Sequence, residues 1–258
     1  MPPKQKKKSS SGSLKLVNNN GPSKVPFSVL EAYKNIRVHL TSMLANIDGN
    51  VVAISSPNAS EGKSTTAVNT AIILSQLEKK VLLIDADIRR ASIHKKLKME
   101  KGTGCMDVVL GKAQFEDVIL KYNPFLDVMT AGTSISNSSE IFSFEAFDTL
   151  LANLRTEYDY IIIDTPPVNL VSDALVISKK CDGLLLVVRT GVTTYDAFID
   201  TLEHASVLDI NILGVVMNGV DGSSGRYGKY GKYGRYGRYG KYGRYGYYYG
   251  YGSSESSQ

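Results

Sequence analysis

The sequence predicts an α/β fold of three layers, in which a mostly parallel β-sheet carries helices on both faces. Five continuously apolar runs have the composition of strands buried on both faces, and they span residues 81–87, 126–130, 160–164, 183–189 and 212–218. Segments with helical spacing lie between them, for instance 141–155 and 196–207. In such sheets, ligands bind beyond the carboxyl ends of the strands.

A sixth strand leads into a phosphate-binding loop. The apolar residues Val51, Val52 and Ile54 predict a buried strand, and helical spacing resumes at Ala67. Between them lies Gly62-Lys63-Ser64-Thr65, and a GK[ST] sequence at a helix start binds phosphate through backbone N–H groups and the helix dipole. The fold is therefore expected to be P-loop NTPase-like, although Pro57 stands where the full motif has glycine.

The loop predicts a site for ATP and Mg²⁺. Lys63 is expected to bridge the β- and γ-phosphates, and the Ser64 hydroxyl is expected to ligate Mg²⁺. The residues expected to bind the nucleotide are Ser60, Glu61, Gly62, Lys63, Ser64 and Thr65.

Three carboxylates follow apolar strands. Asp85 and Asp87 end the run 81–87, and Asp164 ends the run 160–164. Residues two apart on a strand point the same way, so Asp85 and Asp87 are expected to share a face. Three carboxylates at one sheet edge repel each other unless a cation is present, and Mg²⁺ bound with ATP supplies it.

The two ends of the chain differ from this body. Residues 1–25 carry six lysines and no acid, and we expect a disordered basic arm.

A helix is expected to begin at Ser28, with Ser28 and Glu31 forming a capping box. Its apolar face would consist of Leu30, Tyr33, Ile36, Leu40, Met43 and Leu44.

The C-terminal segment 222–258 is a repeat of glycine, a basic residue and tyrosine. It lacks the proline of a collagen helix and cannot build a core, so we expect a flexible arm. The segment has seven basic residues and one acid, whereas residues 25–221 have 17 basic against 24 acidic residues, a net charge of −7. Its tyrosines are Tyr227, Tyr230, Tyr233, Tyr236, Tyr239, Tyr242, Tyr245, Tyr247, Tyr248, Tyr249 and Tyr251.

Several other classes of protein are disfavoured. The apolar runs are too short to cross a bilayer, and the basic N-terminus is followed by no apolar segment of a secretory signal. Cys105 and Cys181 are isolated, which indicates a reducing cytosol, and the three histidines lack metal-ligand spacing.

The order of these motifs resembles the bacterial tyrosine kinases, the cytoplasmic autokinases of capsule and exopolysaccharide synthesis. The motifs are GKST, the sequence LLIDADIR at 82–89, IIIDTPP at 161–167 and a terminal tyrosine cluster. The resemblance covers residues 28–221, within a predicted kinase domain of residues 26–221, and the tail 222–258. Ala91 replaces a usual proline, and the loop 132–140 lacks the prolines of the family.

The resemblance implies a role for each matching residue. Lys63, Asp85 and Asp87 would be catalytic, with Asp85 orienting the tyrosine hydroxyl as its base. Ser64, Asp87 and Asp164 would hold Mg²⁺. Asn218 would either contact adenine or cap the end of its strand. The eleven tail tyrosines would be phosphorylated, and each phosphate adds roughly −1.5 to −2 charge.

The resemblance also implies partners. Glu31, Lys34 and Arg37 match a helix that contacts the next subunit of a homo-oligomeric ring, although Lys34 replaces an arginine there. The family further implies a separate transmembrane activator of the polysaccharide co-polymerase kind, a phosphotyrosine phosphatase, and a cytoplasmic place at the inner face of the cell membrane. It implies no specific nucleic acid.

Three other functions stay open. An ATPase switch of the division-site or plasmid-partition kind would share the fold, but those proteins carry a second lysine at the position of Asn58. The tail alone could bind nucleic acid through stacking and charge. An inert tail on an ATPase predicts no phosphotyrosine.

Overall fold

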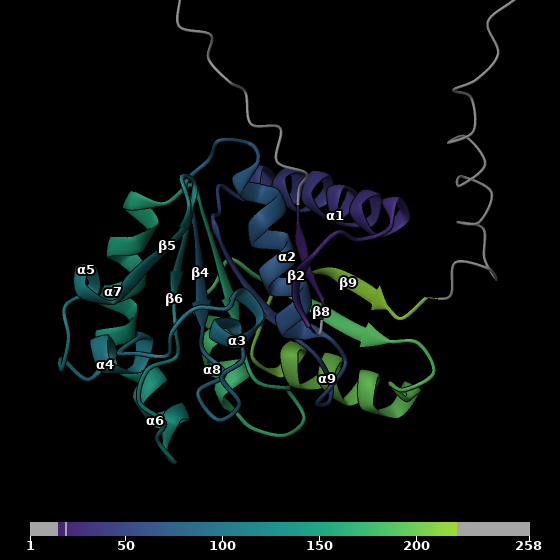
Figure 1. The fold of residues 1–258 in the computed structure, drawn as a ribbon. Helices are drawn as coiled ribbons and strands as arrows, with labels where there is room; N and C mark the ends of the chain where they lie inside the picture. The colour runs from purple at the N-terminus through teal and green to yellow at the C-terminus, as the bar shows by residue number, and fades with distance from the viewer. Residues whose placement is uncertain (1–14, 19, 221–258) are drawn as a thin grey trace, which may run out of the picture. The chain divides into compact units, whose positions relative to one another are not determined.

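A seven-stranded sheet runs through the middle of the computed structural model, which describes residues 15–18 and 20–220 (Figure 1). The strands are β1 (Leu16–Asn18), β2 (Gly21–Ser23), β3 (Val51–Ser55), β4 (Val81–Asp85), β5 (Ile119–Asn123), β6 (Leu126–Met129), β7 (Tyr160–Asp164), β8 (Gly183–Arg189) and β9 (Ile212–Asn218). The helices are α1 (Phe27–Asn46), α2 (Lys63–Ser75), α3 (Ile93–Leu97), α4 (Cys105–Val109), α5 (Phe115–Val118), α6 (Ser138–Ser143), α7 (Glu145–Glu157), α8 (Asp173–Lys179) and α9 (Tyr195–Val207).

The sheet has the strand order β5-β6-β4-β7-β3-β8-β9, and only the edge strand β5 is antiparallel to its neighbour. Its central strands β4, β7 and β3 run parallel, so their carboxyl ends meet at one edge. Asp85 at the end of β4 is in register with Asp164 at the end of β7. The predicted mostly parallel sheet is confirmed, and it brings these two carboxylates together.

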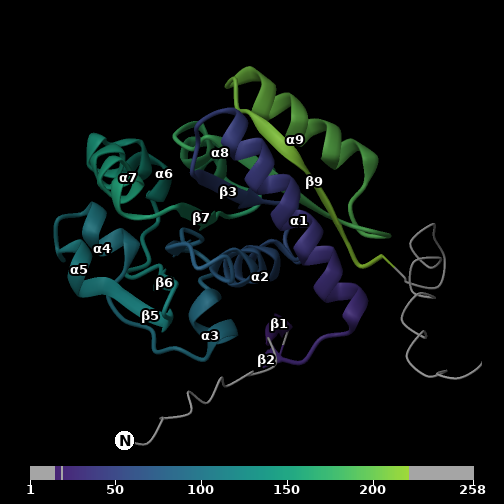
Figure 2. The same cartoon turned by 90° about the horizontal axis from the view of Figure 1, so that it is seen from above.

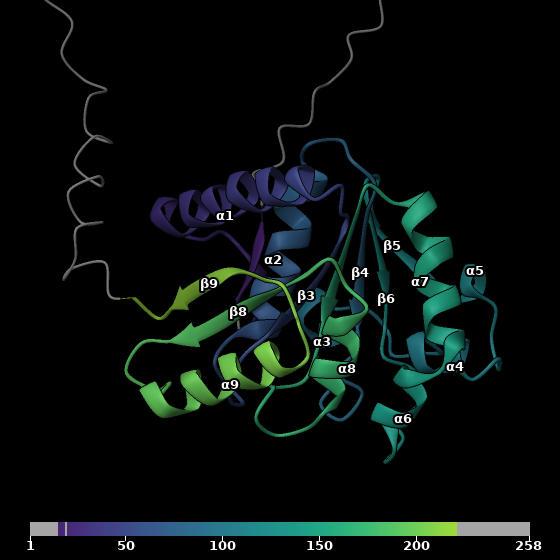
Figure 3. The same cartoon turned by 180° about the vertical axis from the view of Figure 1, so that it is seen from behind.

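Two helical layers cover the sheet. Alternate residues of β3 point to opposite faces: Val52 and Ile54 belong to the core beneath α1 and α2, whereas Val51 and Ala53 belong to the cores on the other face. Figure 2 shows α1 and α2 together on one side of the sheet. Figure 3 shows α7, α8 and α9 on the other. The predicted three-layer arrangement is confirmed.

The N-terminal prediction is wrong for the part that the structure describes. Within 1–25, strands β1 and β2 form a hairpin, and Leu16 and Val17 are buried against the core of α1 and α2. The Asn69 side chain of α2 accepts a hydrogen bond from the Val17 N–H at 2.7 Å and donates one to its carbonyl at 3.0 Å. Through these two bonds the Asn69 side chain pairs with the backbone of Val17, as a neighbouring strand would. Residues 1–14 and the tail 221–258 lie outside the described residues.

The predicted capping box at Ser28 is wrong. Helix α1 begins at Phe27. The carbonyl oxygen of Pro26, the residue before the helix, accepts hydrogen bonds from the N–H groups of Val29 and Leu30, both at 3.1 Å. Ser28 therefore lies inside the first turn and cannot cap it. The predicted apolar face is otherwise confirmed, with Leu40 and Leu44 buried and three further residues packed on the core, but Met43 is exposed.

Three other boundaries differ from the prediction. The expected helix 141–155 is two helices, α6 and α7, because Phe144 between them has an extended backbone with ψ 151°. Strand β4 ends at Asp85, so Asp87 lies in the following loop. Strand β6 likewise ends one residue early, at Met129. No helix among the described residues is long and apolar enough to span a membrane.

Candidate active site

The phosphate-binding loop joins the fully buried strand β3 to helix α2. Gly62 immediately before the helix has φ 105°, a left-handed conformation that favours glycine. A Cβ at this position would lie 2.1 Å from Nδ2 of Asn218, so a larger residue would push into β9. The first hydrogen bond of the helix runs from the Thr66 N–H to the Gly62 carbonyl at 2.9 Å. The preceding N–H groups have no partner within the helix and are available for an anion.

Lys63 lies between two of the predicted carboxylates. Its Nζ donates to Oδ2 of Asp87 at 2.7 Å, to Oδ1 of Asp164 at 3.3 Å and to Oγ of Ser64 at 3.2 Å. Burial by itself would lower the pKa of Lys63, but the negative charges of Asp164 and Asp87 raise it overall. The predicted convergence of Lys63, Asp87 and Asp164 is therefore present, and Lys63 stays charged.

Asp85 is fully buried beside this group. Its Oδ2 accepts hydrogen bonds from the N–H groups of Ser92 and Ile93, both at 3.0 Å, at the start of α3. Its Oδ1 is buried and has no partner among the described residues. Burial and the nearby charge of Asp164 raise the pKa of Asp85 to about 8. The expectation that Asp85 and Asp87 share a strand face is wrong, because the strand ends between them.

The comparisons with known proteins agree with this geometry. A family model described as "AAA domain" matches residues 49–205. The chain is 35% identical over 190 residues to tyrosine-protein kinase YwqD of Bacillus subtilis (strain 168), covering 73% of this chain and 80% of that protein. The solved kinase domain of Escherichia coli tyrosine kinase ETK superposes with a TM-score of 0.72 at 28% identity, covering 90% of this chain and 83% of that one.

The chain belongs to the bacterial tyrosine-kinase family, and it is a protein-tyrosine kinase. A further relative is the succinoglycan biosynthesis transport protein ExoP of Rhizobium meliloti (strain 1021), 31% identical over 195 residues. That match covers 74% of this chain, but the chain spans only about a quarter of ExoP, since 25% of that protein is covered.

Three predicted nucleotide-binding residues of this kinase, Glu61, Asn218 and Ser60, make contacts that hold the loop. The Glu61 carboxylate is fully buried and accepts from the Asn58 N–H at 2.9 Å and from the Thr193 hydroxyl at 2.6 Å. Asn218 Nδ2 donates to the Glu61 carbonyl at 2.9 Å, and Ser60 O accepts from Arg189 at 3.1 Å. For Asn218 this is the strand-end contact, and its contact with adenine stays a prediction.

Two kinds of residue around the loop were not predicted from the sequence. Thr193 and Arg189 hold the loop from the end of β8, and no local motif marks them. Lys96 of α3 donates to the Thr65 hydroxyl at 2.9 Å, on the first turn of α2. The available signal for Lys96 was the group of basic residues that follows Asp87, at 89–90 and 95–96.

The oxygen atoms around Lys63 fit Mg²⁺. Among the described residues, no three His, Cys, Asp or Glu side chains form a metal-binding group by themselves. However, Mg²⁺ takes one or two carboxylates and completes its shell with waters and phosphate oxygens. Within residues 15–18 and 20–220, the fully buried Oδ2 of Asp164 has no partner, and Asp87 and Ser64 offer two further oxygens nearby. These residues suit a magnesium ion brought in with a nucleotide.

The predicted subunit-contact residues of α1 make contacts within the chain. Lys34 Nζ pairs with Glu31 at 2.7 Å, and Arg37 donates to the Ile73 carbonyl of α2 at 3.3 Å. Their contact with a second subunit stays a prediction. The tail tyrosines lie outside the described residues.

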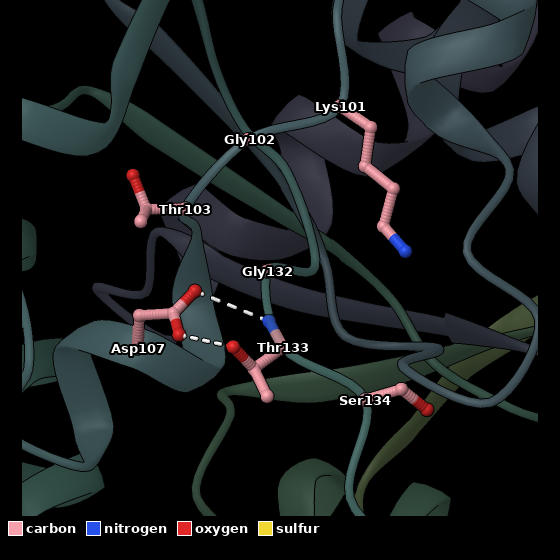
Figure 4. A pocket seen from close by; sticks show the side chains of 7 residues that line it. All are labelled: Lys101, Gly102, Thr103, Asp107, Gly132, Thr133 and Ser134. Atoms are coloured by element: carbon pink, nitrogen blue, oxygen red, sulfur yellow. Dashed lines mark hydrogen bonds between the residues drawn. The ribbon is translucent and has the colours of Figure 1, made fainter.

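None of these predicted site residues lines an open pocket of about 330 Å³ (Figure 4). Asp107 binds the backbone and hydroxyl of Thr133 across it, and these hydrogen bonds lower the pKa of Asp107 below its usual value despite partial burial. The pocket is lined by Lys101, Gly102, Thr103, Asp107, Gly132, Thr133 and Ser134. Asp107 there fastens two loops together.

Proposed function

We propose that this kinase transfers the γ-phosphoryl group of ATP to tyrosines of its own C-terminal cluster, between subunits, and so regulates the synthesis and export of capsular or extracellular polysaccharide. One observation carries the proposal: Lys63 lies against Asp87 and Asp164 at the N-terminus of α2, beside the buried Asp85. A cation, an amide cradle and three carboxylates are the parts that phosphoryl transfer requires.

The loop and Lys63 would bind the phosphates. The N–H groups at the start of α2 would hold phosphate oxygens, and Lys63 would turn from its carboxylates towards the β- and γ-phosphates. Ser64, Asp87 and Asp164 would hold Mg²⁺, which when bound neutralises the charge that develops on the phosphate oxygens. Glu61 and Thr193 keep the loop in shape while this happens.

Asp85 would accept the proton of the tyrosine hydroxyl. The new bond forms between the tyrosine oxygen and the γ-phosphorus, the bond from that phosphorus to the bridging oxygen breaks, and ADP leaves. The proton would go to Oδ1 of Asp85, which has no partner in the described part of the chain, since Oδ2 accepts the N–H groups at the start of α3. Burial and the charge of Asp164 raise the pKa of Asp85 to about 8 in the ligand-free chain, so the carboxyl is largely protonated at pH 7. It would become a base when a bound cation offsets that repulsion.

Charge supports transfer to the tail. The segment 222–258 has seven basic residues and one acid, and residues 25–221 have a net charge of −7. A neighbouring subunit therefore attracts the unmodified tail, and each added phosphate weakens that attraction. A homo-oligomeric ring, a transmembrane activator that brings the kinase to the inner face of the membrane, and a phosphotyrosine phosphatase complete the proposal. ExoP, a relative, is named as a succinoglycan transport protein.

The test is phosphosite mapping by mass spectrometry after incubation of the purified full chain with Mg²⁺ and ATP. We expect phosphotyrosine between Tyr227 and Tyr251. Lys63→Met should abolish it, whereas Lys95→Met removes an exposed lysine of α3 and should not. ATP hydrolysis without any phosphotyrosine would favour the ATPase switch. Tight, salt-sensitive RNA binding in a filter assay would favour the nucleic-acid alternative.

A further inference from the structure

Lys96 brings a second lysine to the N-terminus of the helix that carries Lys63. Lys96 belongs to the short helix α3, and its Nζ donates to Oγ1 of Thr65 at 2.9 Å. Thr65 is the last residue of the GKST sequence and lies in the first turn of α2. Lys96 therefore reaches the end of α2 at which the unpaired N–H groups lie.

Lys96 and Lys63 differ in their charged neighbours. Lys63 is neutralised by Asp87 and Asp164, whereas among residues 15–18 and 20–220 no acidic side chain forms an ion pair with Lys96. Lys96 is half-buried, and burial lowers the pKa of its ammonium group. The negative charge of Asp164 opposes this lowering of the pKa, and the positive charge of Lys63 adds to it. A half-buried cation facing a hydroxyl and a second cation is stabilised when an anion enters.

Two neighbouring elements fix the position of Lys96. Asp85 accepts the N–H groups of Ser92 and Ile93 and so holds the start of α3. The hairpin of β1 and β2 packs on the other side, where Gly21 lies against the Lys98 side chain and a Cβ would approach its Cε to 2.9 Å. The lysine is thus placed by the fold and is not a free surface side chain.

We propose that Lys96 binds the nucleotide's α- and β-phosphates and is a second phosphate-binding lysine of the site. This inference rests on the proposed function, because it requires ATP at the start of α2. In P-loops the amides cradle the α- and β-phosphates while the motif lysine reaches the β- and γ-phosphates. Thr65 lies further into the helix than Lys63, so Lys96 faces the phosphates nearer the nucleoside. Oδ2 of Asp164 is fully buried and has no partner among the described residues, which indicates that a cation brought in with the nucleotide belongs beside these phosphates.

Lys96 adds a positive charge that the loop itself does not supply. Residues 56–65 contain no basic residue besides Lys63, and the neutral Asn58 lies five positions before it. The Asn58 N–H instead donates to Glu61 and shapes the loop. The second positive charge comes from α3, within the same subunit.

The experiment measures binding of ATP, ADP and AMP to the full chain in the presence of Mg²⁺, by calorimetry. Lys96→Met should weaken ATP and ADP binding to a similar extent, by about tenfold to hundredfold, the effect of losing one charge-assisted hydrogen bond. Lys96→Arg should retain most of the affinity. The matched control Lys95→Met removes an exposed lysine of the same helix and should change affinity by less than about twofold.

The salt dependence separates a phosphate contact from a structural one. With Lys96 present, ADP affinity should fall more steeply with ionic strength than in Lys96→Met, whereas a residue that only fastens α3 would leave this slope unchanged. An unchanged slope, equal affinity in Lys96→Met and wild type, or a loss confined to ATP would each overturn the inference. Failure of the wild-type chain to bind any nucleotide would instead overturn the proposed function.

Discussion

Replacing Lys63 by methionine should destabilise the ligand-free kinase as well as inactivate it. The lysine is only 8% exposed, and its Nζ is the nearest cation to Asp87 and to the fully buried Asp164. Breaking a buried ion pair by removing one partner typically costs 3–5 kcal/mol. We expect about 3 kcal/mol, the lower end of that range, because Asp164 can take up a proton and relieve the loss.

The sign of the pH dependence follows from Asp164. Burial raises the pKa of Asp164 and Lys63 opposes that rise, so removing Lys63 raises the pKa further. A group whose folded-state pKa lies above its unfolded value contributes stability at low pH, and that stability is lost as the pH rises through the folded-state pKa. The destabilisation caused by Lys63→Met should therefore be larger at pH 8 than at pH 5.

The assay is urea unfolding of the wild type and of Lys63→Met at pH 5 and pH 8. EDTA is present so that no divalent cation substitutes for the lysine. Adding Asp164→Asn to Lys63→Met should recover part of the loss at pH 8 and little at pH 5. The matched control Lys95→Met should leave stability unchanged at both values, because that side chain is exposed. Equal destabilisation at pH 5 and pH 8, or no recovery in the double variant, would refute the reasoning.

Three more predictions concern single side chains. Asp85→Asn should reduce phosphotyrosine formation far more than it reduces ATP binding, whereas Asp164→Asn should weaken the binding of Mg²⁺–ATP itself. Equal losses of binding and of transfer in both variants would contradict these separate roles. Asp182→Asn should lower the free energy of unfolding at pH 7, because despite partial burial its hydrogen bonds with an arginine and two backbone N–H groups lower the pKa of Asp182. That carboxylate stabilises the fold above its unfolded pKa, so in urea titrations the difference from wild type should shrink as the pH falls through the folded-state pKa. Asn69→Ala should free the β1–β2 hairpin, which loses both side-chain bonds to Val17, and limited proteolysis should then cut near Val17 sooner than in wild type.

The proximity of Asp85 and Asp164 was predictable because both residues end parallel strands. Apolar runs identified β4 and β7, and parallel strands place their carboxyl ends at one edge, so Asp85 and Asp164 had to be neighbours. The direction of Asp87 was not predictable in the same way, because the strand ends before it. Its contact with Lys63 depends on the path of the loop, not on a strand period.

The features that could not be predicted from the sequence depend on contacts between residues far apart in the chain. Glu61 looked like a nucleotide ligand from its place in the loop, but its partner Thr193 is far along the chain and turns the carboxylate inwards. The N-terminal hairpin was missed because its strands are three residues long and depend on the Asn69 side chain of α2 for a backbone partner. Lys96 was missed because α3 is a single turn positioned by Asp85.

The most direct test of phosphoryl transfer between subunits uses two full-length chains. One carries Lys63→Met and keeps its tail, and the other is active but has its eleven tail tyrosines replaced by phenylalanine. After incubation of the mixture with Mg²⁺ and ATP, mass spectrometry measures phosphotyrosine on the Lys63→Met chain. We predict phosphate on several tyrosines of that tail, increasing with the concentration of the active chain. A Lys63→Met tail that stays unmodified at high concentration, while the wild-type chain modifies its own tail, would contradict transfer between subunits.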